Sequence, residues 1–316
     1  LDEGAQSWVN EKLVYTHGIG LAMSPVTEFT PEGRPEFFAS DIPSDGTIAI
    51  QSASAVDEPE TVISNPRIYY GEKTTNYVIV NTKHGELDYQ AEGGELKSVN
   101  YFGIGGVPVD SILRRLAYAW QFGDINILIT DNITEGSRIQ YRREIQERIS
   151  DLAPFLKLDD DPYIVAADGK LFWVQDAYLT TDHYPYSHPN PIGFNYIRNS
   201  VKVTMDAYDG SLRFYIWDVH DPLVMTYDRI FPSLFLGKEQ MPPSLQTHVR
   251  YPQDLFGFQA AKYLKYHMES SEDFYNLEDL WSIPNEKFGQ SSELQPVDPY
   301  YVIMKMPGED RAEFVL

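Results

Sequence analysis

The residues with the clearest capacity for chemistry lie in a loop rich in proline and tyrosine. Asp182, His183 and His188 fall in or beside this loop, which includes Tyr184-Pro185-Tyr186. Imidazole groups held by rigid neighbours can bind a metal ion or transfer protons, and irregular loops often carry function. The same tyrosines and prolines could instead pack as a structural plug. Further along the chain, Asp221 could add a carboxylate to a site formed by these histidines.

The second candidate site is a cluster of arginines, which is unusual in an acidic chain. It includes Arg138, Arg142 and Arg148. Guanidinium groups can clamp a carboxylate or a phosphate through paired hydrogen bonds, so Arg138 and Arg142 are candidate ligand-binding residues. The simpler alternative is that these arginines form ion pairs with Glu144, Glu147 and other nearby acidic residues.

Three consecutive aspartates provide the weakest candidate, a metal site. Asp159 and Asp161 could offer oxygen ligands to Ca²⁺ or Mg²⁺. Adjacent aspartates point in different directions, however, and the spaced pattern of a calcium loop is missing. A solvated turn is the alternative interpretation. Because Pro162 follows directly, the sequence also predicts a subdomain seam near residues 151–162.

Most sequence signatures of known chemistry are missing. There is no Gly-x-Ser-x-Gly elbow and no His-Glu-x-x-His zinc motif. The segment from Gly71 to Thr74 does not fit a phosphate-binding loop, because Glu72 separates the glycine from Lys73. The absence of cysteine excludes disulfides, thiolate catalysis, zinc–thiolate sites and iron–sulfur clusters from these residues. The sequence therefore specifies neither a catalytic residue nor a cofactor.

Composition limits the class of protein and its partners. Hydrophobic residues make up 42% of the 316 residues, which is enough for one large domain or two ordinary ones. The balance of 25 basic against 47 acidic residues gives a net charge of -22. A field of this sign repels nucleic acid and anionic membranes, so neither is expected to bind the surface as a whole. Cations, basic partners or plain solubility remain compatible with it.

Two segments carry the strongest turn signal for a β-hairpin. Asp168-Gly169 and Asp209-Gly210 each lie between arms rich in β-branched and aromatic residues. This dipeptide suits the tight turn because the turn needs positive φ angles. The sequence therefore predicts hairpins over residues 163–174 and 201–218.

Helices are predicted where apolar residues recur at spacings of three and four. The predicted ranges are 110–120, 137–152 with Ser137 as its cap, 222–230, and 254–268. The apolar side of the first consists of Ile112, Leu113, Leu116, Ala119 and Trp120. In the last, the apolar stripe is more typical of a core-facing helix than of a cofactor site.

The remaining pattern predicts strands. Residues 125–129 form an apolar run typical of a buried strand, and residues 67–70 and 76–80 flank a turn like the arms of a hairpin. Residues 300–306 and 312–316 also have strand character. The fold class expected from these elements is α+β, with antiparallel β-hairpins packed against several helices.

The order of several short motifs resembles the soluble region of uncharacterised protein family 0182, and this likeness covers nearly the whole chain. The motifs that carry it are Trp8-Val9-Asn10, Leu13-Val14-Tyr15-Thr16-His17-Gly18, Ser24-Pro25-Val26, Asp41-Ile42-Pro43, Pro66-Arg67-Ile68-Tyr69-Tyr70-Gly71-Glu72, Ala153-Pro154-Phe155-Leu156, Asp161-Pro162-Tyr163, Asn195-Tyr196-Ile197-Arg198-Asn199-Ser200-Val201-Lys202, Asp206-Ala207-Tyr208-Asp209-Gly210 and Arg250-Tyr251-Pro252.

The resemblance implies a prokaryotic membrane protein with several N-terminal spans and a large soluble region outside the cytoplasm. Residues 1–316 would then be a fragment of that region, at the extracytoplasmic face of the cell membrane, with the N-terminal spans as a partner. Leu1 is not a methionine and residues 312–316 stop within a predicted strand, so we expect both ends to be cut. No activity and no catalytic residue come with the resemblance.

Two functions from different classes are compatible with the sequence. The favoured hypothesis is a non-enzymatic extracytoplasmic domain that binds a ligand or a partner. The alternative is a cell-envelope hydrolase or transferase that uses carboxylates and the loop with His183 and His188. The alternative requires Asp182, the two histidines and Asp221 to converge in one deep cleft.

Overall fold

The computed structural model describes residues 7–24, 30–34, 37, 48–50, 61–90, 94–287, 293–309 and 312–316. The chain divides into two compact units. The first contains residues 1–158 and 162–248, and the second contains residues 159–161 and 249–316. The seam predicted near residues 151–162 contains residues 159–161, which belong to the second unit. The main boundary between the two units lies between His248 and Val249.

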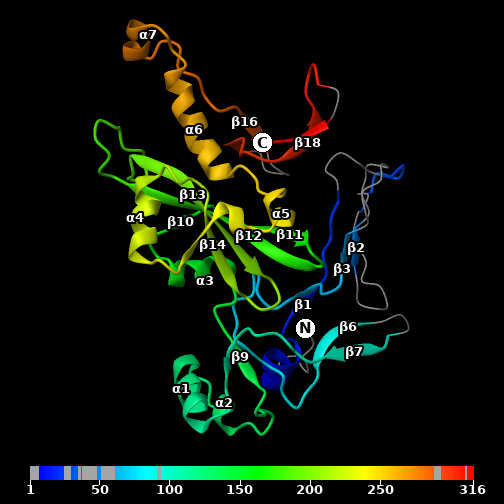
Figure 1. Cartoon of the computed structure of the whole chain (residues 1–316). Coiled ribbons are helices and arrows are strands. Elements are labelled where there is room, and N and C mark those ends of the chain that lie inside the picture. Colours follow the sequence, from blue (N-terminus) through cyan, green and yellow to red (C-terminus); the bar gives the residue numbers. More distant parts are fainter. Residues whose placement is uncertain are drawn as a thin grey trace. The chain divides into compact units, whose positions relative to one another are not determined.

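The chain contains both helices and strands (Figure 1). The helices are η2 (Asn10–Val14), α1 (Ile112–Phe122), α2 (Asn126–Ile129), α3 (Ile145–Leu152), α4 (Pro222–Ile230), η3 (Lys238–Gln240), α5 (Pro243–Gln246), α6 (Gln253–Tyr266) and α7 (Ser271–Asn276). The strands of the first unit are β1 (Gly18–Ile19), β2 (Ile48–Ile50), β3 (Thr61–Ile63), β4 (Arg67–Ile68), β5 (Val78–Val80), β6 (Glu86–Gln90), β7 (Leu96–Val99), β8 (Val107–Pro108), β9 (Arg138–Gln140), β10 (Lys157–Leu158), β11 (Tyr163–Ala167), β12 (Lys170–Thr181), β13 (Tyr196–Asp206), β14 (Leu212–Ile216) and β15 (Phe235–Gly237).

A six-stranded sheet organises the first unit. Its order is β10-β12-β13-β14-β15, and β11 pairs with the same edge of β12 as β10 does. The two predicted hairpins are confirmed as β11–β12 and β13–β14. Their turns use left-handed backbone at Asp168, Gly169 and Gly210, with φ angles of 51°, 74° and 71°. The predicted α+β class is also confirmed, because antiparallel pairs and helices occur together.

One face of this sheet forms the main core with α3 and α4. The sheet contributes Ala177, Leu179, Val201, Val203, Met205, Phe214 and Ile216, and the helices contribute Ile145, Ile149 and Val224. Asp221 caps α4 by accepting a hydrogen bond from Leu223 N at 2.9 Å, and Pro222 occupies the first turn. The predicted helix over residues 222–230 is therefore confirmed.

Two predicted elements are wrong because local capping favours another structure. Residues 125–129 form no strand, because Asp124 Oδ1 accepts from Asn126 N at 3.0 Å and starts the short helix α2. The helix predicted from Ser137 begins only at Ile145, where Glu144 caps it. Residues 138–140 instead form β9, which pairs with β5 and β8.

A third prediction, the hairpin over residues 67–80, is wrong because each arm pairs with a strand that is distant in sequence. β4 pairs with β1, and β5 pairs with β9, so the two arms are not partners. Their backbone groups find strands that are distant in sequence, which the local pattern could not reveal.

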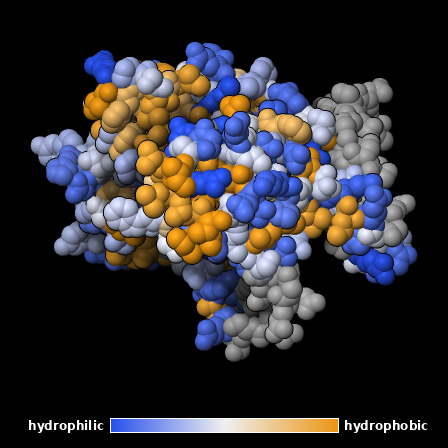
Figure 2. Space-filling model, turned by 90° about the horizontal axis from the view of Figure 1, so that it is seen from below, coloured by the Kyte–Doolittle hydropathy of each residue, from blue (hydrophilic) through white to orange (hydrophobic). Residues whose placement is uncertain are grey.

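The helix α1 was predicted correctly, but its apolar side faces outward. Ser111 caps it and Gly123 ends it in a left-handed conformation. Ala119 is buried, whereas Ile112, Leu113, Leu116 and Trp120 are all more than half exposed. The underside view shows hydrophobic side chains gathered on that face of the molecule (Figure 2).

The second unit contains α6, α7 and two antiparallel strand pairs. The pairs are β16 (Asn285–Lys287) with β17 (Leu294–Pro296), and β18 (Val302–Lys305) with β19 (Ala312–Val315). The helix predicted over residues 254–268 is confirmed as α6, although none of its side chains is fully buried. A pocket of about 500 Å³ lies within this unit and includes Phe256, Ala260 and Val297. Among the residues that the structure describes, no helix has both the length and the apolarity needed to cross a membrane.

Candidate functional site

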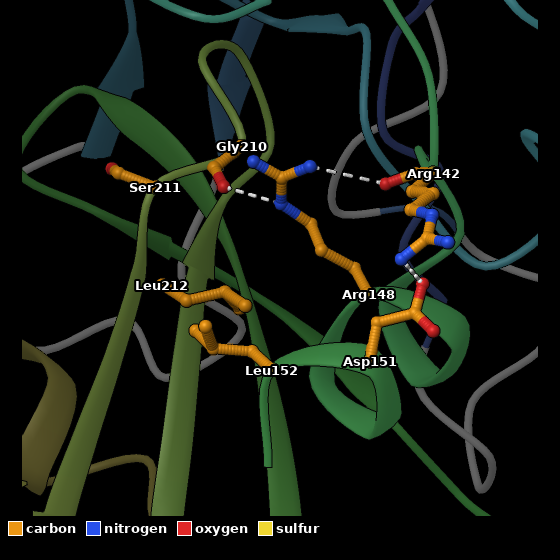
Figure 3. Close-up of a pocket in the computed structure, with 7 residues that line it drawn as sticks. All are labelled: Arg142, Arg148, Asp151, Leu152, Gly210, Ser211 and Leu212. Carbon is orange, nitrogen blue, oxygen red and sulfur yellow. Dashed lines mark hydrogen bonds and ion pairs between the residues drawn. The ribbon is translucent and has the colours of Figure 1, made fainter. Parts of the chain in front are cut away.

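A pocket of about 360 Å³ brings together two of the arginines and the turn of the second hairpin (Figure 3). We call it the arginine pocket. Its lining residues come from the segment around α3, from the β13–β14 turn and from the start of β14. They are Arg142, Arg148, Asp151, Leu152, Gly210, Ser211 and Leu212.

The backbone before α3 sends neighbouring arginines in different directions. Arg142 adopts a left-handed conformation with a φ of 49°, and its side chain is exposed at the pocket. Arg143 is 4% exposed and donates to the carbonyl oxygens of Tyr69, Asn76 and Thr16 at 2.6, 3.1 and 2.6 Å. Burial lowers the pKa of Arg143 to about 10, so it remains charged at neutral pH. The arginine pocket therefore uses Arg142 but not its neighbour.

Arg148 is the second cation of the pocket. Its Nε donates to the Gly210 carbonyl at 2.8 Å, and Nη1 donates to the Arg142 carbonyl at 3.2 Å. The guanidinium carbon lies 4.9 Å from the centre of the Tyr70 ring, within the range of a cation–π contact. Burial raises the pKa of Tyr70, and the charges of Arg148 and Arg143 act in the opposite direction. Neutral groups thus hold Arg148 in place without cancelling its charge.

Gly210 allows this close packing. Its φ is 71°, and a Cβ atom built on it would lie 2.6 Å from Tyr70 Cδ1. A side chain at this position would therefore collide with the ring that supports Arg148. The Asp-Gly turn, predicted only as a hairpin signal, has a second role as part of the pocket wall.

The charges of the pocket favour an anion. Arg142 forms an ion pair with Asp151, and both side chains are partly exposed. In the described part of the chain, no carboxylate lies within ion-pair distance of Arg148. The pocket lining therefore contains two guanidinium groups and one carboxylate, and Leu152 and Leu212 point toward one another beside them (Figure 3). This arrangement suits a small ligand with a carboxylate or phosphate group and an apolar part.

Arg138, the other arginine proposed from the sequence, lies outside this pocket. Its Nε donates to the Gly105 carbonyl at 2.8 Å, and Nη2 donates to the carbonyls of Ile104 and Gly106 at 2.8 and 2.7 Å. It therefore fastens the loop before β8 and does not line the arginine pocket.

The histidine loop connects β12 to β13 and is open to solvent. The His183 side chain is 87% exposed and contacts Asp182. His188 Nδ1 lies 2.8 Å from the carbonyl oxygen of Pro189. Neither histidine lines the arginine pocket.

Asp221 is buried in the protein interior, unlike the exposed loop that contains His183. It is 0% exposed and accepts hydrogen bonds from Tyr196 Oη at 2.8 Å and from Ser200 Oγ. These bonds and the cap of α4 occupy both carboxylate oxygens. The structure gives Asp221 a structural role, whereas His183 is at the surface.

Asp159 and Asp161 lie at the start of α6 in the second unit. Asp159 Oδ2 accepts from Asp254 N at 3.1 Å, and Asp159 Oδ1 accepts from Asp161 N at 3.2 Å. Asp161 Oδ2 accepts from Gln253 Nε2 at 3.0 Å. These contacts are those of a helix cap and its turn. Within the described ranges, no group of three or more acidic or histidine side chains is arranged to hold a metal ion.

Sequence reasoning placed Arg142 and Arg148 in one cluster but missed the other pocket residues. Ser211 and Leu212 follow the Asp-Gly turn, and Asp151 and Leu152 end α3. The only local signal was the turn itself. The meeting of α3 with that turn depends on the packing of the sheet, which spacing along the chain does not encode.

Comparisons with known proteins give a family. The chain matches the model of "Uncharacterised protein family (UPF0182)" over residues 1–316. It is 48% identical over 312 residues to a UPF0182 protein of Pelotomaculum thermopropionicum, covering 99% of this chain and 33% of that protein. It is 47% identical over 317 residues to a UPF0182 protein of Moorella thermoacetica, covering 100% of this chain and 33% of that one.

A third relative extends the range of organisms. The UPF0182 protein of Methanospirillum hungatei is 46% identical over 322 residues, which cover 100% of this chain and 34% of that protein. The chain thus spans about a third of the length of the curated relatives that it matches. No solved structure matches it. The full-length family match and these identities show that the chain belongs to the uncharacterised protein family UPF0182.

Proposed function

We propose that this chain is a non-enzymatic, ligand-binding domain and that the arginine pocket binds a small anionic ligand. The observation that carries the proposal is the position of Arg148. Two carbonyl oxygens and the Tyr70 ring orient its guanidinium at a pocket of about 360 Å³. Because these groups are neutral, the charge of Arg148 remains to be matched by a ligand.

The composition of the pocket supports binding over catalysis. The lining residues include Ser211 and Asp151 but no histidine that could activate a hydroxyl group. Asp151 is already paired with Arg142. A hydrolase or transferase would need a nucleophile and a base in reach of one another. The arginine pocket offers charge and shape instead.

The proposed cellular setting rests on the family. The motifs shared with the family imply a multi-span membrane protein, and the relatives matched here are about three times as long as this chain. We place the domain at the extracytoplasmic face of the cell membrane, with the N-terminal spans of the same protein as its partner. Ligand binding by such a domain would be sensed or used by those spans. Protease accessibility of a tagged full-length protein in intact cells tests this side of the membrane.

Binding can be tested with inorganic phosphate and succinate as probes of the two ligand chemistries. Each probe is titrated against the 316-residue chain while the melting temperature is followed at constant ionic strength, with chloride as the reference. The matched pair of variants is Arg142→Gln, in the pocket, and Arg213→Gln, an exposed arginine on β14 outside its lining. We expect the probe-dependent rise in melting temperature to weaken in Arg142→Gln and to persist in Arg213→Gln.

The response to the two probes distinguishes the ligand chemistry. A rise with phosphate alone assigns the pocket to phosphate groups, and a rise with succinate alone assigns it to carboxylates. An equal response of both variants would show that the probes act on the surface in general. That result, or no rise with either probe, contradicts the proposed anion site.

A further inference from the structure

Helix α1 has two apolar faces, of which only one is used by the fold. Tyr118, Ala119 and Phe122 pack into a core cluster with Ile79, Val109 and Ile139. The second face contains Ile112, Leu113, Leu116 and Trp120, with exposed fractions of 64%, 75%, 53% and 87%. At 100° per residue these four side chains project within one 100° arc. The exposed face is therefore continuous along the helix.

Helix α2 extends this face. It packs directly after α1, where Asp124 N donates to the Ala119 carbonyl at 2.9 Å and Arg115 Nη1 to the Thr130 carbonyl at 3.4 Å. Ile127 is fully buried, whereas Ile125 and Ile129 are 60% and 66% exposed. We call the six exposed residues the α1–α2 apolar surface: Ile112, Leu113, Leu116, Trp120, Ile125 and Ile129.

The exposed face cannot be explained by the fold of the unit. Leucine and tryptophan side chains that remain in water gain none of the roughly 25 cal/mol per Å² that burial provides. Contiguous apolar surfaces of this kind mark interaction sites. The buried face already anchors α1, since Arg115 Nη2 also donates to the Ile133 carbonyl at 3.2 Å. The α1–α2 apolar surface is therefore available for a second contact.

The charges around this surface distinguish between its partners. The α1 segment contains Arg114 and Arg115 and no acidic residue, although acidic residues outnumber basic ones by 47 to 25 in the chain. Arg114 forms an ion pair with Asp110, just before the helix, at 2.9 Å. A helix with an apolar Trp/Leu face and basic residues beside it is typical of the membrane interface, and tryptophan is enriched there. A second copy would bring a further net charge of -22 close by, which opposes self-association.

We propose that the α1–α2 apolar surface inserts into the interfacial layer of a lipid bilayer. Trp120, the most exposed of the six, would lie at the level of the headgroups, with the aliphatic side chains in the acyl region. Because the whole chain is strongly acidic, the expected surface is one rich in zwitterionic lipid. The proposal goes beyond anion binding, and its residues are separate from the arginine pocket.

The test uses the 316-residue chain and phosphatidylcholine vesicles. Flotation measures binding, and quenching of tryptophan fluorescence by brominated lipid measures insertion. The test variant combines Leu116→Gln and Trp120→Gln. The control combines Tyr186→Gln and Ile192→Gln, which remove exposed apolar side chains of the β12–β13 loop, 109% and 58% exposed.

We expect the partition coefficient of the test variant on the vesicles to be at least about tenfold lower than that of the original chain. The control should bind as the original chain does, and both variants should keep its circular dichroism spectrum and melting temperature. Quenching should fall in the test variant beyond the loss of one tryptophan, because the remaining four no longer approach the lipid.

Two results would overturn the proposal. One is equal vesicle binding by the chain and the test variant. The other is the absence of vesicle binding together with a concentration-dependent dimer, seen by sedimentation, that the test variant does not form. The second result would assign the α1–α2 apolar surface to a second copy of the chain. Neither outcome depends on anion binding, so failure here leaves the arginine pocket unaffected.

Discussion

Arg143 and Glu86 are both buried, and the same two residues bridge them. Arg143 donates to the carbonyl oxygens of Tyr69 and Thr16, each at 2.6 Å. The side-chain hydroxyls of those residues donate to Glu86 Oε2, at 2.7 Å from Tyr69 and 2.6 Å from Thr16. Glu86 Oε1 accepts from the backbone N of Asn81 and Tyr101 at 3.0 Å each. A buried cation and a buried anion are thus joined through Tyr69 and Thr16.

Replacing Arg143 should be among the most destabilising single changes in the chain. Arg143→Gln would leave buried carbonyl oxygens without donors and would remove the buried charge that Tyr69 and Thr16 join to Glu86. We expect the free energy of unfolding to fall by roughly 3–5 kcal/mol, the range for breaking one partner of a buried charge pair. Urea unfolding followed by circular dichroism measures the difference.

Arg142→Gln is the matched control for this prediction. The two arginines are adjacent, but Arg142 is exposed and its ion pair with Asp151 is at the surface. Exposed pairs contribute only about 0.2–1 kcal/mol. If both variants unfold at the same urea concentration, the network around Glu86 does not stabilise the fold as argued.

Asp88 should make stability depend on pH in the acid range. Arg67 holds it through two bonds, Nε to Oδ1 at 2.9 Å and Nη2 to Oδ2 at 2.6 Å, and His17 Nε2 lies 3.3 Å from Oδ1. Burial alone would raise the pKa of Asp88, but the contacts with His17 and Arg67 outweigh it and lower the pKa below the usual 3.8. The carboxylate is therefore more stable in the folded than in the unfolded chain.

The sign of the effect follows from this shift. The contribution of Asp88 is fully present above pH 3.8 and is lost as the pH falls toward the lowered pKa of the folded state. In melts between about pH 5 and about pH 2, Asp88→Asn should lose stability less steeply than the original chain. Asp182→Asn, which removes a carboxylate that is 62% exposed, serves as the control. A slope for Asp88→Asn as steep as that of the control contradicts the prediction.

Gly210→Ala should destabilise the hairpin turn by more than its φ angle alone explains. The added Cβ would lie 2.6 Å from Tyr70 Cδ1 and would displace the ring beneath Arg148. Gly123→Ala is the control, because its φ of 65° is similar to the 71° of Gly210 and nothing lies within 4 Å of its Cβ position. We expect a loss of roughly 1 kcal/mol at Gly123 and of roughly 2–4 kcal/mol at Gly210. Equal losses in urea melts would show that Tyr70 moves aside freely.

Local signals in the sequence predicted the elements whose structure is decided locally. Asp-Gly turns gave both hairpins, and Asp221-Pro222 gave the start of α4. The failures came where distant segments decide. Residues 138–140 joined β5 and β8 as a strand, although their local pattern favoured a helix. For α1 the periodicity correctly predicted a helix, but it could not show which of two apolar faces packs inward.

The candidate site was predictable only in part, for the same physical reason. The cluster containing Arg142 and Arg148 is visible in the sequence, because both lie close to α3. That Arg138 turns to the loop before β8 and Arg143 to the interior depends on carbonyl groups from distant segments. The participation of Gly210 depends on the close approach of its carbonyl group to Arg148.

Asp151→Asn should strengthen anion binding at the arginine pocket, which few substitutions would do by chance. Asp151 competes with a bound anion for Arg142, and it also adds a negative charge beside Arg148. An asparagine of nearly the same shape removes that charge. Because the ion pair is partly exposed, we expect a gain in affinity of roughly twofold to fivefold, matching the modest energies of such pairs.

The measurement is a titration of Asp151→Asn with the probe, phosphate or succinate, that raises the melting temperature of the original chain. Asp228→Asn, on α4 and outside the pocket lining, is the control for the change in net charge. A general electrostatic effect would raise affinity equally in both variants, whereas a site at Arg142 responds only to Asp151. Unchanged affinity in Asp151→Asn would show that Arg142 does not contact the anion, and it would contradict the proposed site.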